Sequence, residues 1–230
     1  MHIKGFQKLS LLDYPGLLAA TIFTGGCNFR CGFCHNPGLV LKHREGSDLD
    51  IDKILITLDK RKKILRGICI TGGEPLLQDD LDEFILAVKN MGYLIKLDTN
   101  GSFPDKLKLL IDKELINYVA MDIKNSLDKY NLTAGINVNT ELIERSINIL
   151  KENKIPYEFR TTTIKEQHTK DDFMKIGQLL KGSSRYYLQA FNDSNDIITP
   201  GLHAHTKNEM LEFKSILEQY IDFVALRGLD

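Results

Sequence analysis

The sequence predicts an α/β protein in which a mainly parallel sheet forms a partial, open TIM-like (β/α)6 barrel preceded by short N-terminal strands. Strand-like and helix-like apolar patterns alternate along the 230 residues with short connections, which is typical of a parallel sheet. About six βα units can be counted, fewer than the eight that close a full barrel. Because no repeat, low-complexity tract or linker interrupts the pattern, residues 1–230 are expected to form a single domain.

Four strands are predicted in the first half of the chain, each from a short apolar run. They cover residues 3–11 (as one or two short strands), 17–23, 67–71 and 93–97. Apolar residues at helical spacing predict two helices between them, around residues 51–65 and 81–88. Pro104 marks the first turn of a third helix, because proline is favoured at that position.

The second half continues the same alternation. Its predicted strands cover residues 115–123, 157–164, 186–190 and 222–226. The predicted helices begin at Thr140 as N-cap, near Lys170, and at Thr206, which has capping-box spacing to Glu209. The segment 192–205 lacks apolar periodicity, and we expect it to cover the open side of the barrel, with His203 and His205 as polar loop residues.

Composition and charge are those of an ordinary soluble protein, with 43% hydrophobic and 27% charged residues. A formal charge of −1 gives no general attraction to nucleic acid or to acidic membranes. The most apolar early run, residues 17–23, is far shorter than the roughly 20 residues that span a bilayer, and no signal-peptide core precedes it. We therefore expect a cytoplasmic protein, in which closely spaced cysteines bind metal more often than they form disulfides.

Three of the four cysteines lie in one loop directly after the predicted strand 17–23. Cys31 follows Cys27 by four positions, and Cys34 follows Cys31 by three. Thiolates are suited to iron–sulfur clusters, zinc or copper(I). A [4Fe–4S] cluster normally takes four cysteines, so three would leave one iron without a protein ligand. An open position on a metal is typical of a catalytic site.

A zinc site would need a fourth protein ligand. His35 is adjacent to Cys34 and would strain the geometry. Cys69 lies between Ile68 and Ile70 in a predicted buried strand, where a cysteine is usually a small core residue. Zinc binding and purely structural or redox-active cysteines remain alternatives to the cluster.

The spacing Cys27-x-x-x-Cys31-x-x-Cys34 resembles the signature of the radical S-adenosylmethionine (SAM) enzymes. This resemblance implies that the open iron chelates the amino and carboxylate groups of SAM. It also implies that the reduced cluster cleaves SAM to methionine and a 5′-deoxyadenosyl radical. Phe33, just before the last cysteine, would pack near the adenine.

Polar clusters follow several of the predicted strands, at the edge where parallel α/β sheets carry their chemistry. Gly72-Gly73-Glu74 could be an ordinary glycine turn, but it resembles the motif of the same family that binds the SAM amino group. Paired glycines allow close backbone approach, and a glutamate can accept hydrogen bonds from an ammonium group. We therefore predict a role for all three in SAM binding.

Two further strand ends resemble those of the glycyl-radical-enzyme activases. Asp98 opens an Asp-Thr-Asn-Gly stretch in which the aspartate would lie near SAM, although Asn-Gly is also a common turn. Asp122 and Lys124 match an Asp-Leu-Lys stretch whose polar groups would contact SAM. Being two positions apart, these two residues share one face of a strand.

Arg160 and Gln189 complete the predicted site. A buried arginine needs an anionic partner, and for Arg160 this is either the SAM carboxylate or an internal carboxylate such as Glu158 or Asp122. Some activases carry a histidine near SAM on the last strand, where this chain has Gln189 as a polar substitute.

Three stretches indicate which branch of the family the chain resembles. Cys34-His35-Asn36-Pro37 is similar to a stretch of the glycyl-radical-enzyme activases and makes His35 a site residue. Residues 5–16 and Ala225-Leu226-Arg227-Gly228 resemble the activating proteins of anaerobic ribonucleoside-triphosphate reductases. Since only Cys69 remains beyond the three ligands, an inserted ferredoxin-like domain is excluded.

The resemblance implies an oxidoreductase that receives an electron from flavodoxin or ferredoxin and forms a glycyl radical on the large anaerobic reductase. Three alternatives remain open. They are a pyruvate formate-lyase-type activase, a small-molecule radical SAM enzyme such as a deazaguanine synthase, and a non-enzymatic zinc or iron–sulfur regulatory module. The last would leave the strand-end motifs unexplained.

Overall fold

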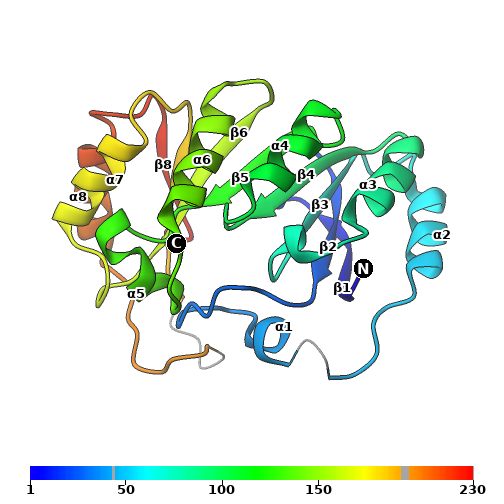
Figure 1. Ribbon diagram of the computed structural model, residues 1–230, viewed down its shortest axis with the longest axis horizontal. Coiled ribbons are helices and arrows are strands. Elements are labelled where there is room, and N and C mark those ends of the chain that lie inside the picture. Colours follow the sequence, from blue (N-terminus) through cyan, green and yellow to red (C-terminus); the bar gives the residue numbers. More distant parts are fainter. Residues whose placement is uncertain (43–44, 193–196, 230) are drawn as a thin grey trace.

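A computed structural model describes residues 1–42, 45–192 and 197–229 and contains an eight-stranded sheet in the order β1 to β8 (Figure 1). The strands are β1 (Ile3–Ser10), β2 (Ala19–Thr24), β3 (Gly67–Gly72), β4 (Leu94–Thr99), β5 (Tyr118–Asp122), β6 (Tyr157–Thr163), β7 (Tyr186–Ala190) and β8 (Val224–Arg227). β1 runs antiparallel to β2, and every later neighbouring pair is parallel. Within the described part of the chain β1 and β8 remain unpaired with each other, so the predicted open barrel is confirmed.

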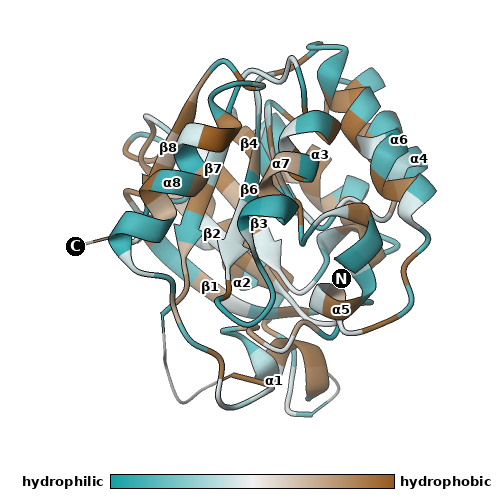
Figure 2. Ribbon diagram, turned by 90° about the vertical axis from the view of Figure 1, so that its left-hand side faces the viewer, coloured by the Kyte–Doolittle hydropathy of each residue, from teal (hydrophilic) through white to brown (hydrophobic). Residues whose placement is uncertain are grey.

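Helices form the crossovers between the parallel strands. They are α1 (Pro37–Leu41), α2 (Ile51–Arg61), α3 (Leu81–Asn90), α4 (Pro104–Asp112), α5 (Tyr130–Ala134), α6 (Thr140–Lys151), α7 (Lys170–Leu179) and α8 (Lys207–Leu217), with 3₁₀ turns at Pro75–Leu77 and Leu127–Lys129. The outer helices carry both hydrophobic and hydrophilic residues, as expected for one buried and one exposed face (Figure 2).

Helix capping follows the predicted chemistry with one correction. Thr206 and Glu209 form the predicted capping box of α8. The N-cap of α6 is Asn139 rather than Thr140, because the Asn139 side chain accepts a hydrogen bond from the backbone N–H of Glu141. None of the described helices is long and apolar enough to cross a membrane.

Two short helices that the sequence analysis did not predict lie near the carboxyl ends of the strands. α1 follows the cysteine loop, and α5 follows β5. Figure 1 shows both along the lower edge of the molecule, together with the loop after β2 and the described part of the segment before α8. Of the predicted covering segment 192–205, residues 193–196 lie outside the described residues. Residues 197–205 hydrogen-bond to the cysteine loop at Gly32 and to the connection after β6 at Lys165, and the covering role of the whole segment stays a prediction.

Candidate functional site

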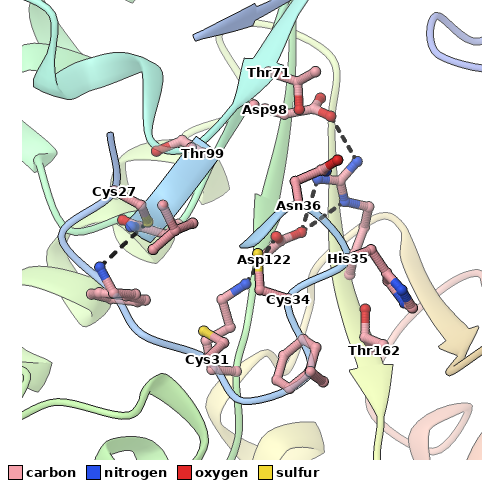
Figure 3. Close-up of a pocket in the computed structure, with 18 residues that line it drawn as sticks. Cys27, Cys31, Cys34, His35, Asn36, Thr71, Asp98, Thr99, Asp122 and Thr162 are labelled. Atoms are coloured by element: carbon pink, nitrogen blue, oxygen red, sulfur yellow. Dashed lines mark hydrogen bonds and ion pairs between the residues drawn. The ribbon is translucent and has the colours of Figure 1, made fainter. Parts of the chain in front are cut away.

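A cavity of about 190 Å³ lies at the carboxyl ends of the strands and brings most of the predicted site residues together (Figure 3). The predicted residues that line it are Cys27, Cys31, Phe33, Cys34, His35, Gly72, Gly73, Asp98, Asp122, Lys124 and Arg160. Glu74 and Gln189 are absent from the lining. Residues far apart in the sequence meet here because parallel strands end at one edge of the sheet.

Backbone hydrogen bonds hold the cysteine loop on several sides. The N–H of Gly26 donates to the carbonyl of Leu39 at 2.8 Å, which ties the loop to α1. The N–H of Arg30 donates to the carbonyl of Ala134 in α5, also at 2.8 Å. These contacts give the two unpredicted helices a function, since both position the loop that carries the cysteines.

Gly72 and Gly73 are required by the close approach of the cysteine loop. A Cβ on Gly73 would lie 1.8 Å from the carbonyl oxygen of Gly26. Gly72 adopts φ +118°, a conformation that favours glycine, and a Cβ there would lie 2.3 Å from the nitrogen of Thr24. The close backbone approach that the paired glycines predicted is present, and the approaching backbone belongs to this chain.

The three thiols of the loop are free, and those of Cys27 and Cys31 are desolvated. Burial raises the pKa of Cys27 to about 12, and the carboxyl of Glu74 adds to the rise. Burial also raises the pKa of Cys31. A thiolate at either position therefore needs a bound cation, because neither has enough positive charge around it in the protein alone.

Five alternating charges extend across the cavity and beyond it; we call Lys96, Asp98, Arg160, Asp122 and Lys124 the charge ladder. Arg160 donates from Nε to Asp122 at 2.9 Å and from an NH group to Asp98 at 3.1 Å. Lys124 Nζ lies 3.0 Å from the other oxygen of Asp122, and Lys96 pairs with Asp98. Three cations against two anions leave the ladder with a net positive charge.

The charge ladder contains the anionic partners of Arg160. These are the internal carboxylates of Asp122 and Asp98, and Asp122 lies directly opposite Arg160 in the register of β5 and β6. Burial alone would raise the pKa of Asp122, but Arg160 and Lys124 lower it to about 2. Glu158, the other predicted partner, instead accepts two hydrogen bonds from Arg227, at 2.7 and 3.0 Å.

The sequence analysis missed Lys96, whereas Cys69 is a free and fully buried thiol, as predicted. Cys69 Sγ lies 3.7 Å from Lys96 Nζ, so this thiol faces the charged interior of the barrel and not the apolar core that holds Ile68 and Ile70. The alternation of side chains between the two faces of a strand could have revealed the position of both residues. Lys96 shares a face with Asp98, and Cys69 must point away from its two isoleucine neighbours.

Glu74 lies behind the cavity wall and is fully buried. Its carboxylate accepts hydrogen bonds from Thr99 Oγ1 at 2.8 Å and from the N–H groups of Asn100 at 2.7 Å and Leu76 at 3.1 Å. Burial raises its pKa to about 7 in spite of these donors. Thr99 and Asn100 do line the cavity, so Glu74 positions the wall. Direct contact between Glu74 and SAM stays a prediction.

Gln189 lines a second cavity of about 460 Å³ inside the barrel. Its other lining residues are Leu12, Asp13, Pro15, Lys96, Asp98, Glu158, Arg160, Arg227 and Gly228. Asp98 and Arg160 line both cavities. The second cavity therefore adjoins the first through the charge ladder.

The two histidines predicted as polar loop residues differ in environment. His203 is exposed and pairs with Glu166 at 2.7 Å, as expected for a loop residue. His205 also lies in the loop, as predicted, but its ring is buried and edge-on to Phe213 at 4.8 Å.

The sequence profile of the radical SAM superfamily matches residues 21–180, which include most of β2, the cysteine loop and β3 to β6. The chain belongs to this superfamily. A candidate glycyl-radical-enzyme activating enzyme of Methanocaldococcus jannaschii is 33% identical over 99% of this chain and 96% of its own length. The pyruvate formate-lyase-activating enzyme of Staphylococcus aureus is 27% identical over 78% of this chain and 75% of its own length. This radical SAM protein is thus an enzyme of the glycyl-radical activase branch.

Solved structures share the fold of this radical SAM protein. SuiB of Streptococcus suis, bound to S-adenosylmethionine, gives a TM-score of 0.68 at 14% identity. The match covers 88% of this chain but only 48% of the SuiB chain. A domain of the pyruvate-formate lyase-activating enzyme from Bacteroides vulgatus gives 0.56 at 17% identity, covering 71% of this chain and 99% of that domain.

Radical SAM enzymes use a [4Fe–4S] cluster and SAM, and the residues present fit both groups. Three buried or half-buried thiols line one cavity, opposite the net positive charge of the ladder. Among the described residues, no three His, Cys, Asp or Glu side chains converge closely enough to hold a single metal ion.

Proposed function

We propose that this chain forms a glycyl radical on an anaerobic ribonucleoside-triphosphate reductase, acting as a single radical SAM domain over residues 1–230. The observation that carries the proposal is the convergence of the three cysteines and the charge ladder on one cavity. When bound, the cluster and SAM together supply a radical that abstracts hydrogen. The protein holds these groups, orients them and keeps water away.

The proposed division of roles follows the two sides of the cavity. Cys27, Cys31 and Cys34 hold the cluster. The ladder, with its net positive charge, attracts the carboxylate of SAM. Phe33 is buried, with Lys124 Nζ 5.7 Å from its ring centre, and offers an apolar surface for the adenine.

In this proposal the remaining predicted residues shape the cavity or position its walls. Gly72 and Gly73 let the cysteine loop approach β3, and Glu74 holds the wall that contains Asn100. His35 lines the rim of the cavity, with its ring stacked on Phe191 at 5.4 Å.

The second cavity is the proposed entry for the glycine-bearing segment of the partner. It lies within the open barrel and meets the SAM cavity at Asp98 and Arg160. Leu12, 90% exposed, lies at its rim, where an apolar segment of the partner could pack. Gln189 lines this second cavity, so we assign it to the partner segment in preference to SAM.

The reductase is favoured as partner because both stretches that resemble reductase activases meet at the second cavity. Leu12, Asp13 and Pro15 come from the first stretch, and Arg227 and Gly228 come from the last. The residues that distinguish this branch thus lie where a partner segment would be selected. The proposal places the protein in the cytoplasm, where thiols stay reduced and flavodoxin or ferredoxin can supply the electron.

An electron paramagnetic resonance experiment tests the proposal. The chain is reconstituted with iron and sulfide, reduced, mixed with SAM, and combined in turn with the anaerobic reductase and with pyruvate formate-lyase. A glycyl-radical doublet on the reductase is expected. A doublet on pyruvate formate-lyase alone would refute the partner assignment, and one tightly bound zinc in place of about four irons would refute the cluster.

A further inference from the structure

The segment of residues 197–205, which we call the strap, crosses the cysteine loop at Gly32. The N–H of Thr199 donates a hydrogen bond to the carbonyl of Gly32 at 2.9 Å. Figure 1 shows the strap as the orange chain below α5, on the same lower edge as the cysteine loop. It thus joins the end of the chain to the loop between Cys31 and Cys34.

The close approach of the strap, and not the backbone conformation at position 32, explains why this residue is a glycine. Its φ lies outside the positive range that favours glycine, so a residue with a side chain could adopt this conformation. A Cβ at this position would lie 2.7 Å from Thr199 Oγ1 and 2.9 Å from Thr199 Cβ. The two segments therefore touch with no room for a methyl group.

The strap is anchored at points away from Gly32. The N–H of Lys165 donates to the carbonyl of His203 at 3.0 Å, and the N–H of His203 donates to Glu166 at 3.0 Å. Leu202 packs against the main core. Just before the segment, the ring of Phe191 stacks on His35 at 5.4 Å. The strap that contacts Gly32 is therefore fixed in place by hydrogen bonds and packing elsewhere along its length.

We infer that Thr199 is a positioning residue for the cluster ligands Cys31 and Cys34, acting through Gly32. This inference rests on the proposed cluster ligands. Cys31 and Cys34 are already joined by a turn, in which the N–H of Cys34 donates to the carbonyl of Cys31 at 3.1 Å. Gly32 lies inside that turn, so pressing or releasing it changes the separation of the two thiols. The strap holds that separation and limits the opening of the loop.

Three variants test the inference: Gly32→Ala, Thr199→Gly and the double variant. Each is reconstituted, and the rate at which iron passes to a chelator is measured, together with the melting temperature of the cluster-free protein. Gly32→Ala should release iron about tenfold faster, because a new methyl group in a filled space forces the strap away. Thr199→Gly alone should raise the rate about twofold, because the side-chain contact with Gly32 is lost while the backbone hydrogen bond remains. The double variant should return most of the way to the unmodified rate.

The double variant decides between the strap and other reasons for a glycine. If it releases iron as fast as Gly32→Ala, the requirement for Gly32 lies elsewhere and the inference is overturned. If the unmodified chain binds no cluster at all, the proposed function fails, which is a different result from a stable cluster with no rescue.

A measurement on the unmodified chain covers the case in which Gly32→Ala does not fold. Coupling between two sites is reciprocal, so a strap that holds the cluster loop must itself be held by the cluster. Hydrogen exchange at the Thr199 amide should slow about tenfold after reconstitution, while exchange in α3, far from the strap, stays unchanged. Equal exchange at Thr199 before and after reconstitution would overturn the inference.

Discussion

The two sides of the SAM cavity are organised by different forces. The charge ladder is complete in the protein alone, because each carboxylate pairs with a lysine two positions away in the chain and with Arg160 of β6. The cysteine loop is held by backbone hydrogen bonds and by contacts too close for a Cβ, while the thiols of Cys27 and Cys31 keep a raised pKa. One side is ready for a ligand, and the other reaches its working charge state only when the ligand binds.

This difference predicts which substitutions should weaken cofactor binding and which should lower the stability of the fold. A cysteine thiol contributes little to the protein without metal, so its removal should affect cluster binding and leave folding nearly intact. A member of the ladder supports both, because a buried charge without its partner destabilises the fold. The predictions below use this contrast.

The largest effect is expected for Cys34→Ala, which should abolish SAM cleavage because the cluster loses one of its three proposed protein ligands. Iron content after reconstitution should fall, while the melting temperature of the cluster-free protein should stay close to that of the unmodified chain. Cleavage is measured by chromatography of 5′-deoxyadenosine after chemical reduction. Full iron content with undiminished cleavage would show that Cys34 is not a ligand.

Arg160→Met should lower stability by about 3–5 kcal/mol, because Asp98 and Asp122 each lose a buried, hydrogen-bonded cation and keep only one lysine. SAM binding to the reconstituted protein should weaken about tenfold or more. Chemical denaturation and calorimetric titration measure the two effects.

Arg227→Met is the matched control for this prediction. It also removes the arginine partner of a buried carboxylate, but that carboxylate is Glu158, which lies outside the SAM cavity. It should lower stability and leave SAM affinity unchanged. Equal losses of SAM affinity in the two variants would contradict the assignment of the ladder to the SAM side.

Glu74→Gln should remove a pH dependence of stability. The folded-state pKa of Glu74, about 7, lies above its ordinary value of 4.5. Between these values the folded state binds more protons than the unfolded state, so this group's contribution falls as pH rises, by up to about 3 kcal/mol. Unfolding of the cluster-free protein is measured in urea from about pH 5 to pH 8. An unchanged pH slope in the variant would show that Glu74 is ionised throughout.

The smallest effect is expected for Cys69→Ala, which should leave iron content and SAM cleavage unchanged. Its thiol makes one long contact, to Lys96 Nζ at 3.7 Å, so stability should change by only about 1 kcal/mol. Iron analysis and thermal unfolding check this. A loss of iron would mean that Cys69 belongs to the metal site.

Much of the secondary structure could be predicted from the sequence, because the periods of strands and helices are local properties. What the sequence could not supply is a residue's surroundings where these come from another element. Cys69 is buried, as predicted, but its contact with Lys96 depends on the neighbouring strand β4. For Glu74, whose contact with SAM stays a prediction, only the structure reveals the donors from the β4 end and the turn at Leu76.

The sequence by itself determined the family, the open α/β barrel and the three cysteines with their missing fourth ligand, since each is a matter of spacing along the chain. Only the tertiary structure decided which partner Arg160 has, because that depends on the register of β5 and β6. It also revealed the strap, since Thr199 and Gly32 meet only in space. The periodicity of a helix or strand is visible within one segment of sequence, whereas a close contact depends on where two separate segments lie in space.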